Sequence, residues 1–317
     1  MNPKIEFTPE SDDLLKFTLS GVNVAYANAI RRTILSDVPV VVFKTTPYTE
    51  NKAKITVNTT RLNNEILKQR LSCIPICIQD LQIPFNNYQL EVDEENKTDT
   101  IMTVTTEHFN IRNLTTDTML DESDKRKIFP PYVPPTGKGE YFIDFVRLRP
   151  KISDEIPGEK IKFTCTFTLG TARDDAMFNI TGTCAYGFTP DFSKMDDEVE
   201  KRIIKWKDEG KNQKEIDFEA KNWKLLEGLR YVKKDSFDFT LQTVGIYENR
   251  DIVVKACNIL IIRLENLIKS LDEDTIEIEP SKSTMENSYD ITLENEDYTI
   301  GNMLNHEIYE IFYKDMG

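Results

Sequence analysis

Residues near the N-terminus alternate between apolar and polar side chains and then change to helical spacing. Leu15 and Phe17 alternate with lysine and threonine, which predicts strand structure over residues 5–20. Asn23 is a favourable helix N-cap, and the apolar residues after it recur at helical spacing until Pro39 ends the helix. The pattern therefore predicts a strand–turn–helix unit at the start of the chain.

Most of the chain between residues 40 and 186 consists of short runs typical of β-strands, separated by turn residues. The clearest runs are residues 54–57, 101–105, 141–146 and 162–167. We expect two interruptions, an acidic stretch at Glu91–Asp99 and a stiff proline-rich loop at Pro130–Pro135. This part of the chain is predicted to be mostly β.

After residue 195 the sequence predicts a charged helical stretch, a strand and a long helix. A highly charged stretch at residues 196–230 has the mixed charge of a solvated helix face. Residues 237–241 then alternate as a strand, and Asp251 is placed to cap a long helix. Its apolar residues form a stripe about 30 Å long from Val253 to Leu271. Such a stripe either packs against the core or receives a second helix, and the spacing does not distinguish the two.

The composition is that of a folded protein with an acidic surface. Of the 317 residues, 39% are hydrophobic and 30% are charged, and the net charge is −14. This balance disfavours a broad phosphate-binding surface, which needs clustered lysine and arginine. The one candidate basic stripe is interleaved with acidic residues and comprises Lys201, Arg202, Lys205, Lys207, Lys211 and Lys214. We therefore expect little or no direct DNA contact.

The N-terminus and the hydropathy pattern bear on where the protein resides. The first ten residues are polar and lack the apolar stretch of a signal peptide. No apolar run approaches the roughly 18–20 residues that a membrane span requires. We expect an intracellular protein without membrane contact.

Residues that carry most protein chemistry are few. The five cysteines are widely spaced, and Cys73 and Cys77 lie in an apolar run without a second cysteine pair nearby. With only His108 and His306 in addition, we expect no metal site, no disulfide framework and no cofactor. The sequence contains no phosphate-binding loop, nucleophile elbow or zinc-protease motif. We therefore expect no catalytic residues and no independent enzymatic activity.

The two ends of the chain contain an internal repeat. Residues 17–30 align without a gap with residues 291–304, at a constant offset of 274 positions (291 − 17). The identical pairs are Thr18 and Thr292, Leu19 and Leu293, and Asn28 and Asn302. Two copies of one unit can pack about a pseudo-twofold axis, each burying the same kind of face. The small residues Ala27 and Gly301 would let the two helices approach closely.

The first copy resembles a known motif. Residues 19–35 are similar to the N-terminal dimerisation motif of alpha subunits of DNA-directed RNA polymerase, which the third-largest eukaryotic subunit and its archaeal counterpart share. The family pattern is a small residue followed by Asn-Ala-Leu-Arg-Arg, and residues 27–32 fit it with Ile30 in place of leucine. Four further segments agree in order, namely residues 64–76, 163–170, 237–245 and 298–304. The last of these resembles the signature of the small partner with which such subunits pair in archaea and eukaryotes.

The resemblance implies an α+β fold with a discontinuous organisation. Residues 1–44 and 236–271 would form an alpha-like dimerisation domain, a sheet with packed helices. It would be interrupted by a mostly β inserted domain, residues 45–235, with a charged helical excursion at 196–230. Residues 272–317 would form a partial small-partner-like unit.

The fusion of two partners in one chain has further implications. It resembles an arrangement found in large DNA viruses, which implies a location in cytoplasmic viral factories or the virion, or in the nucleus if the protein is cellular. The second unit has no equivalent of the segment that completes the first, so we expect a truncated chain that lacks about 50 residues.

The resemblance also implies a role and partners. The chain would be a non-catalytic assembly subunit that forms a pseudo-dimer within itself and supports the two largest polymerase subunits, together with other small subunits. The interface would include Ala27, Asn28, Ile30, Ile34, Leu260, Leu264, Gly301, Asn302, Leu304 and Ile308. Arg31 and Arg32 would dock a large subunit, because arginine forms bidentate pairs; alternatively they are ordinary exposed helix charges. An acidic interaction scaffold or transcription-associated factor outside the polymerase core is the alternative function.

Some family features are missing. Family members often carry a cysteine cluster for zinc, or an iron–sulfur domain, inside the inserted domain, and this sequence has neither. The family's His-Ala-Lys-Trp loop corresponds to Asp175–Phe178, and the usual glutamate of the returning strand is Gln242. The contacts attributed to that loop are therefore not implied for this chain.

Overall fold

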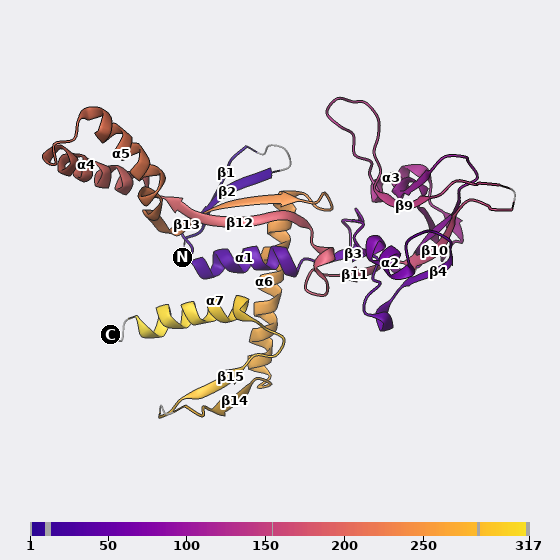
Figure 1. The fold of residues 1–317 in the computed structure, drawn as a ribbon. Coiled ribbons are helices and arrows are strands. Elements are labelled where there is room, and N and C mark those ends of the chain that lie inside the picture. The colour runs from indigo at the N-terminus through magenta and orange to yellow at the C-terminus, as the bar shows by residue number, and fades with distance from the viewer. Residues whose placement is uncertain (1, 10–13, 154, 284–285, 315–317) are drawn as a thin grey trace. The chain divides into compact units, whose positions relative to one another are not determined.

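The computed structural model describes residues 2–9, 14–153, 155–283 and 286–314, and the chain folds as two compact units (Figure 1). The first unit comprises Met1–Thr33, Thr183–Gln242 and Val253–Gly317, and the second comprises Ile34–Gly182 and Thr243–Ile252. The chain passes between them within α1 (Val24–Ser36), β12 (Thr181–Pro190) and α6 (Asn249–Asp272), and after Gln242. The α+β class predicted from the sequence is confirmed.

A four-stranded sheet forms the centre of the first unit. Its strand order is β1 (Lys4–Phe7), β2 (Leu14–Ser20), β13 (Val232–Thr243) and β12. The alternation seen in the sequence places one face of β2 and of the second half of β13 in the interior. There Phe17 of β2 and Phe239 of β13 stack with their ring centroids 4.8 Å apart.

Three further elements of the first unit follow the long helix. The helix α6 begins at Asn249, two residues before the expected cap Asp251, which lies in its first turn. A two-stranded hairpin of β14 (Glu277–Pro280) and β15 (Tyr289–Thr292) comes next. The chain then enters α7 (Tyr298–Ile308) and a π-helical turn (Tyr309–Tyr313).

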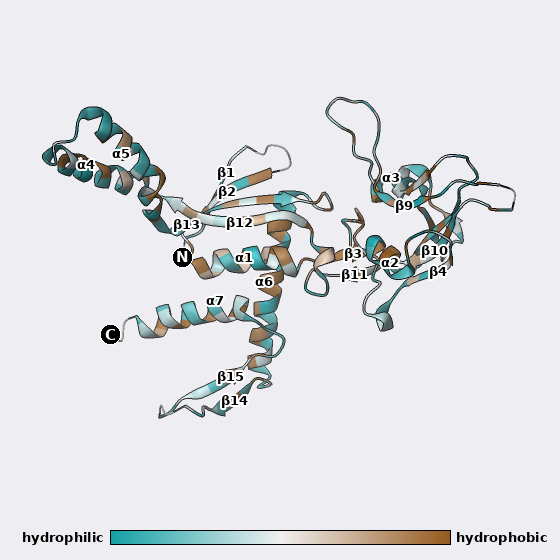
Figure 2. Ribbon diagram, viewed as in Figure 1, coloured by the Kyte–Doolittle hydropathy of each residue, from teal (hydrophilic) through white to brown (hydrophobic). Residues whose placement is uncertain are grey.

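The charged stretch is helical, as predicted, and its two helices form a hairpin. Helices α4 (Phe192–Asp208) and α5 (Gln213–Leu225) are largely hydrophilic (Figure 2). Their contact buries a small apolar cluster that includes Val199 of α4 and Trp223 of α5. The hairpin therefore has a core of its own.

The second unit is built on a five-stranded antiparallel sheet. The strands, in sheet order, are β4 (Ala53–Asn58), β10 (Lys160–Thr166), β5 (Tyr88–Glu95), β7 (Asn110–Asn113) and β8 (Thr118–Met119). Two smaller pairs accompany it: β3 (Val40–Val42) with β11 (Thr168–Gly170), and β6 (Met102–Thr105) with β9 (Asp144–Leu148). Its helices are α2 (Asn64–Ser72) and α3 (Glu122–Ile128).

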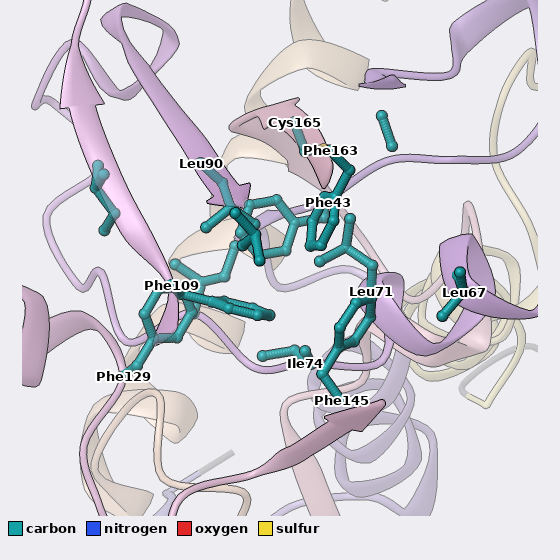
Figure 3. Packing of buried hydrophobic residues seen from close by; sticks show 14 of the residues in the cluster. Phe43, Leu67, Leu71, Ile74, Leu90, Phe109, Phe129, Phe145, Phe163 and Cys165 are labelled. Atoms are coloured by element: carbon teal, nitrogen blue, oxygen red, sulfur yellow. The ribbon is translucent and has the colours of Figure 1, made fainter. Parts of the chain in front are cut away.

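A set of phenylalanine rings in mutual contact lies in the core of the second unit, among aliphatic side chains (Figure 3). Phe109 and Phe145 meet edge to face at 5.6 Å, and Phe145 lies 5.1 Å from Phe163. Leu71 of α2 belongs to the same cluster, so the helix is held on the strands by its buried face. Edge-to-face aromatic pairs of this kind add about 0.5–1.5 kcal/mol each beyond their buried area.

Local expectations for this unit need correction. The break expected at Glu91–Asp99 is wrong in its first half, because Glu91–Glu95 belong to β5, an inner strand of the sheet. Their charges are balanced across the strands, as in the 2.6 Å ion pair between Asp93 and Lys162. The run expected at 141–146 begins as strand β9 only at Asp144.

The boundaries of the two units differ from the expected domains. The sequence placed residues 45–235 in one inserted domain, but residues 183–235, with the charged helices, belong to the first unit. The reason is the pairing of β12 with β13, which brings this segment into the sheet of β2. Conversely, the end of α1 and all of β3 belong to the second unit.

Candidate functional site

The two copies of the repeat share their backbone conformation at the turn. Gly21 has a φ of 74°, and Asn295, the equivalent position 274 residues later, has a φ of 59°. Both residues adopt the left-handed region that glycine and asparagine tolerate best. The similarity therefore extends from residue identity to backbone geometry.

Each copy also starts its helix with the same capping interaction. The Oδ1 of Asn23 accepts a hydrogen bond from the backbone N–H of Ala25 at 2.9 Å. The Oδ1 of Asp297 accepts one from the backbone N–H of Thr299 at 2.8 Å. These caps satisfy donors that helix starts leave unpaired, so α1 and α7 begin at equivalent positions.

The structure extends the repeat to a strand that sequence comparison missed. In the first copy β1 precedes β2, with Phe7 opposite Phe17. In the second copy β14 precedes β15, with Ile278 opposite Ile291, and Ile291 is the equivalent of Phe17. Each copy is therefore a hairpin followed by a helix. The spacing between the first strand and the second differs between the copies, which hides this relation from a gapless alignment.

Helices α1 and α7 meet through equivalent positions. The cluster between them includes Tyr26, Ala29 and Ile30 of α1 and Ile300, Met303 and Leu304 of α7. Each residue of the first set matches one of the second at the offset of 274. Ile300 is fully buried, and Ala29 and Met303 are nearly so. The same face of both copies is buried in one contact, which is the arrangement of an isologous interface.

The stripe of α6 completes this cluster. Leu260 is buried in it, and Leu264 and Leu267 pack against it. The long helix thus receives both α1 and α7, and its stripe serves as the common support for the two copies. We call this cluster of α1, α6 and α7 the pairing site.

Polar contacts at the ends of the two helices fix their antiparallel direction. The hydroxyl of Tyr26, near the start of α1, donates to Glu307, near the end of α7, at 2.6 Å. At the other end, Arg32 donates to Thr299 Oγ1 at 2.9 Å and to Asp297 at 3.2 Å. A side-chain hydrogen bond therefore joins α1 to α7 at each end of their contact.

Electrostatics strengthens the start of α7. Asp297 lies 3.2 Å from Arg32 and 3.6 Å from Arg263, and Arg263 also pairs with Glu296. Negative side chains at a helix N-terminus are favoured by the helix dipole. At the other end, burial, and then the hydrogen bond to Glu307, raise the pKa of Tyr26 above its usual value.

The predicted interface residues fall into two groups. Ile30, Leu260, Leu264 and Leu304 lie in the pairing site. The others lie outside it: Ala27 and Ile34 are buried elsewhere, Asn28 accepts hydrogen bonds from Arg31, Asn302 is exposed, and Ile308 is 55% exposed. A Cβ added to Gly301 would meet nothing within 4 Å, so the close approach expected there is absent.

Sequence reasoning missed Tyr26, Ala29 and Met303. A signal was available, because the offset of 274 pairs Ala29 with Met303 and Tyr26 with Ile300 on the side of each helix that carries Ile30 and Leu304. The signal was easy to overlook, because the paired side chains differ in size and chemical type and neither pair is identical.

The two predicted docking arginines differ in their surroundings. Arg32 donates hydrogen bonds to Thr299 and Asp297 at the start of α7. Arg31 donates to Asn28 Oδ1 at 2.9 and 3.1 Å, and among the described residues no carboxylate lies within ion-pair distance of it. Its charge is therefore not neutralised by the part of the chain that the structure describes.

Other chemistry is limited within the described residues. They contain no group of three or more His, Cys, Asp or Glu side chains arranged to hold a metal ion. Burial raises the pKa of Cys165 to about 12 and that of Cys184 to about 11, so both thiols stay protonated at neutral pH. No described helix has the length and apolarity needed to cross a membrane.

The fold and the pairing site define a dimerisation-type domain in which a capped helix meets its equivalent over a long supporting helix. The chain belongs to the family of the RNA polymerase Rpb3/Rpb11 dimerisation domain, whose sequence profile matches residues 16–264. The match ends within α6, before α7. The resemblance of residues 272–317 to a small partner therefore stays a prediction.

Curated relatives agree with this family over most of the chain. A subunit named "DNA-directed RNA polymerases II, IV and V subunit 3" from Arabidopsis thaliana is 23% identical, covering 87% of this chain and 92% of the relative. The "DNA-directed RNA polymerase subunit Rpo3" of Pyrococcus horikoshii is 26% identical, covering 84% and 97%. The mouse "DNA-directed RNA polymerases I and III subunit RPAC1" is 25% identical, covering 60% and 55%.

Proposed function

We propose that this chain is a non-catalytic assembly subunit of a DNA-directed RNA polymerase. We further propose that its own residues 272–317 take the place of a separate small partner. Family membership and relatives named as polymerase subunits support the first part. The observation that carries the second part is the contact between equivalent positions, with Ala29 and Met303 together in the pairing site.

Fusion has a direct physical consequence for assembly. The two copies of the repeat are joined in one chain, so they meet at an effective concentration in the millimolar range, set by the connecting segment. The pairing then does not depend on how much of a separate partner the cell makes. The result is a preformed platform on which the two largest subunits, and other small subunits, assemble.

Arg31 is the better of the two predicted docking residues. Its side chain is partly exposed and has no carboxylate partner among the described residues, whereas Arg32 already binds Asp297 and Thr299. A guanidinium in this state can form a bidentate ion pair with a carboxylate of a large subunit.

Isotope-mixed cross-linking tests whether the pairing is intramolecular. A chain carrying Tyr26→Cys and Glu307→Cys, at half-buried positions whose side chains meet between α1 and α7, is prepared in light and in heavy-isotope form. The two forms are mixed before a short thiol cross-linker is added. We expect cross-linked peptides that are entirely light or entirely heavy. Mixed pairs at the statistical proportion would show that α7 binds α1 of another chain. The single-cysteine variants control for reaction with the five native cysteines.

Affinity purification tests the polymerase assignment. The tagged chain, recovered from its native cells or infection, should bring down two large polymerase subunits that mass spectrometry identifies. Arg31→Ala should reduce their recovery, and Arg230→Ala, which removes an exposed arginine remote in sequence, should not. A chain recovered free of polymerase subunits would contradict the proposal.

The cellular location is proposed from the sequence resemblance alone. A cytoplasmic viral factory or the virion is expected if the protein is viral, and the nucleus if it is cellular. Fractionation of the producing cells, followed by immunodetection of the chain, distinguishes these locations.

A further inference from the structure

The second unit has a surface groove whose lining residues are not part of the pairing site. It has a volume of about 480 Å³ and lies among α2, the loop before it, and β9. We call it the arginine groove, because four of its lining residues are Arg61, Arg70, Arg147 and Arg149. Among the described residues, Asp144 is the one acidic residue that lines it.

The charge of this groove is opposite to that of the whole chain. Four arginines, less the lining Asp144 and the Glu159 that pairs with Arg149, leave an excess of two positive charges (4 − 2) in a protein whose net charge is −14. Such a local reversal of sign attracts an anionic partner to one place on an otherwise repelling surface. The groove therefore differs from the solvated mixed charge of α4 and α5.

The four arginines differ in whether they already have an internal ion-pair or hydrogen-bond partner. Arg149 pairs with the buried Glu159, and Arg147 is 3.7 Å from Asp144, with a side chain that is 74% exposed. Arg61 is exposed and has no ion-pair or hydrogen-bond partner among the described residues. Arg61 and Arg147 can therefore bind an incoming anion without first losing a strong internal partner.

Arg70 makes the wall of the groove rigid. Its guanidinium donates to the backbone carbonyl of Phe145 at 2.7 Å and to that of Asp144 at 2.9 Å. The side chain of Phe145 is anchored in the aromatic core shown in Figure 3. These contacts join α2 to β9, so the groove is formed before a ligand arrives and binding need not pay for ordering its walls.

The remaining lining is apolar and partly uncovered. Ile101 is 66% exposed, and Leu62 is half-buried at the same groove. A ligand that fits both surfaces carries carboxylates and apolar side chains in close succession. Arginine binds carboxylates bidentately, and the apolar contacts add specificity for their spacing.

We propose that the arginine groove binds an acidic peptide segment of a partner protein, with carboxylates at Arg61 and Arg147 and apolar side chains on Leu62 and Ile101. The chain's overall charge disfavours nucleic acid, whose phosphates would be repelled outside the groove. The described lining also offers no exposed aromatic ring for base stacking, since Phe145 is buried. The proposal is independent of the polymerase assignment.

Fluorescence anisotropy tests it on the full chain. The probe is a short labelled peptide in which glutamate alternates with leucine. We expect saturable binding that weakens about tenfold with Arg61→Glu and again with Arg147→Glu, as loss of a charge-assisted contact predicts. Binding should also weaken with added salt. The matched control is Arg230→Glu, which makes the same charge change at a 78% exposed arginine outside the groove and should leave the Kd unchanged.

Several outcomes would overturn the proposal. These are no binding by the unaltered chain, an equal loss with Arg230→Glu, equal binding of a glutamine–leucine peptide, or tighter binding of a single-stranded oligonucleotide that Arg61→Glu abolishes. Circular dichroism checks that each variant is folded. If Arg147→Glu does not fold, Arg61→Gln carries the test, because Arg61 has no partner to lose among the described residues.

Discussion

Ala29 of α1 and Met303 of α7 are buried in the same cluster and occupy the same position in two copies of one repeat. The two side chains differ, yet the positions around them, Tyr26 with Ile300 and Ile30 with Leu304, are also equivalent and lie in the same cluster. Each copy of the repeat thus contributes the same three positions to the contact.

Truncating Met303 should weaken the pairing site. Met303→Ala removes a side chain that is 5% exposed, and we expect a loss of about 2–3 kcal/mol in the free energy of unfolding of the first unit. Urea denaturation measures it. Tyr298→Ala, at a side chain that is 80% exposed on the same helix, should change the stability by less than about 0.5 kcal/mol. Equal effects of the two changes would argue against a packed contact.

The contact between Arg32 and Asp297 should be measurable by a double-mutant cycle. We expect Arg32→Ala and Asp297→Ala each to destabilise α7, with a coupling free energy of about 0.5–1 kcal/mol, because the Arg32 side chain is 41% exposed. Asp297→Ala should cost more on its own, since it also removes the helix cap. A coupling free energy near zero would show that the two side chains do not interact in solution.

Alkaline pH should lower the free energy of unfolding of the first unit through the ionisation of Tyr26. Its pKa is raised in the folded state by burial and by the hydrogen bond to Glu307, so the neutral phenol is favoured there. This contribution is complete below the unfolded pKa of about 10 and is lost as the pH rises from there toward the folded pKa. Tyr26→Phe should lose about 1 kcal/mol near pH 8 and show a shallower decline above pH 10. The exposed Tyr298→Phe should keep the original slope in the same pH series of urea titrations.

Thiol reactivity should distinguish the exposed and buried cysteines. Cys73 is exposed, whereas Cys165 is fully buried and burial raises its pKa to about 12. We expect a thiol reagent at pH 8 to modify Cys73 rapidly and Cys165 only after unfolding, because the thiolate is the reactive form. Peptide mapping of the labelled sites gives both rates, and Cys73→Ser removes the fast phase. Rapid labelling of Cys165 in the folded chain would mean that the core of the second unit opens readily.

Gly21 should resist substitution more strongly than other glycines with positive φ. A Cβ at Gly21 would lie 2.1 Å from the backbone oxygen of Asn2, whereas one at Gly137 would meet nothing within 4 Å. Both have a positive φ, so Gly137→Ala measures the conformational cost, about 1 kcal/mol, and Gly21→Ala adds the clash. We expect at least about 2 kcal/mol for Gly21→Ala by thermal unfolding. Similar values for both would show that the N-terminal segment moves aside without cost.

The sequence by itself determined the local elements and the repeat. Asn23 and Asp297 start their helices, residues 196–230 form charged helices, and the constant offset marks equivalent positions, all because capping, periodicity and turn chemistry act over a few residues. Family membership followed from the same local motifs. The sequence even contained the pairs that meet in the pairing site, although not the fact that they meet.

Only the tertiary structure decided which faces of these elements come together. It placed Met303 rather than Ile308 in the pairing site, added β1 and β14 to the repeat, and assigned Glu91–Glu95 to an inner strand. It also brought Arg61 and Arg147 to one groove across the intervening chain. Such contacts depend on packing between segments far apart in sequence, where buried area and close fit outweigh local preference.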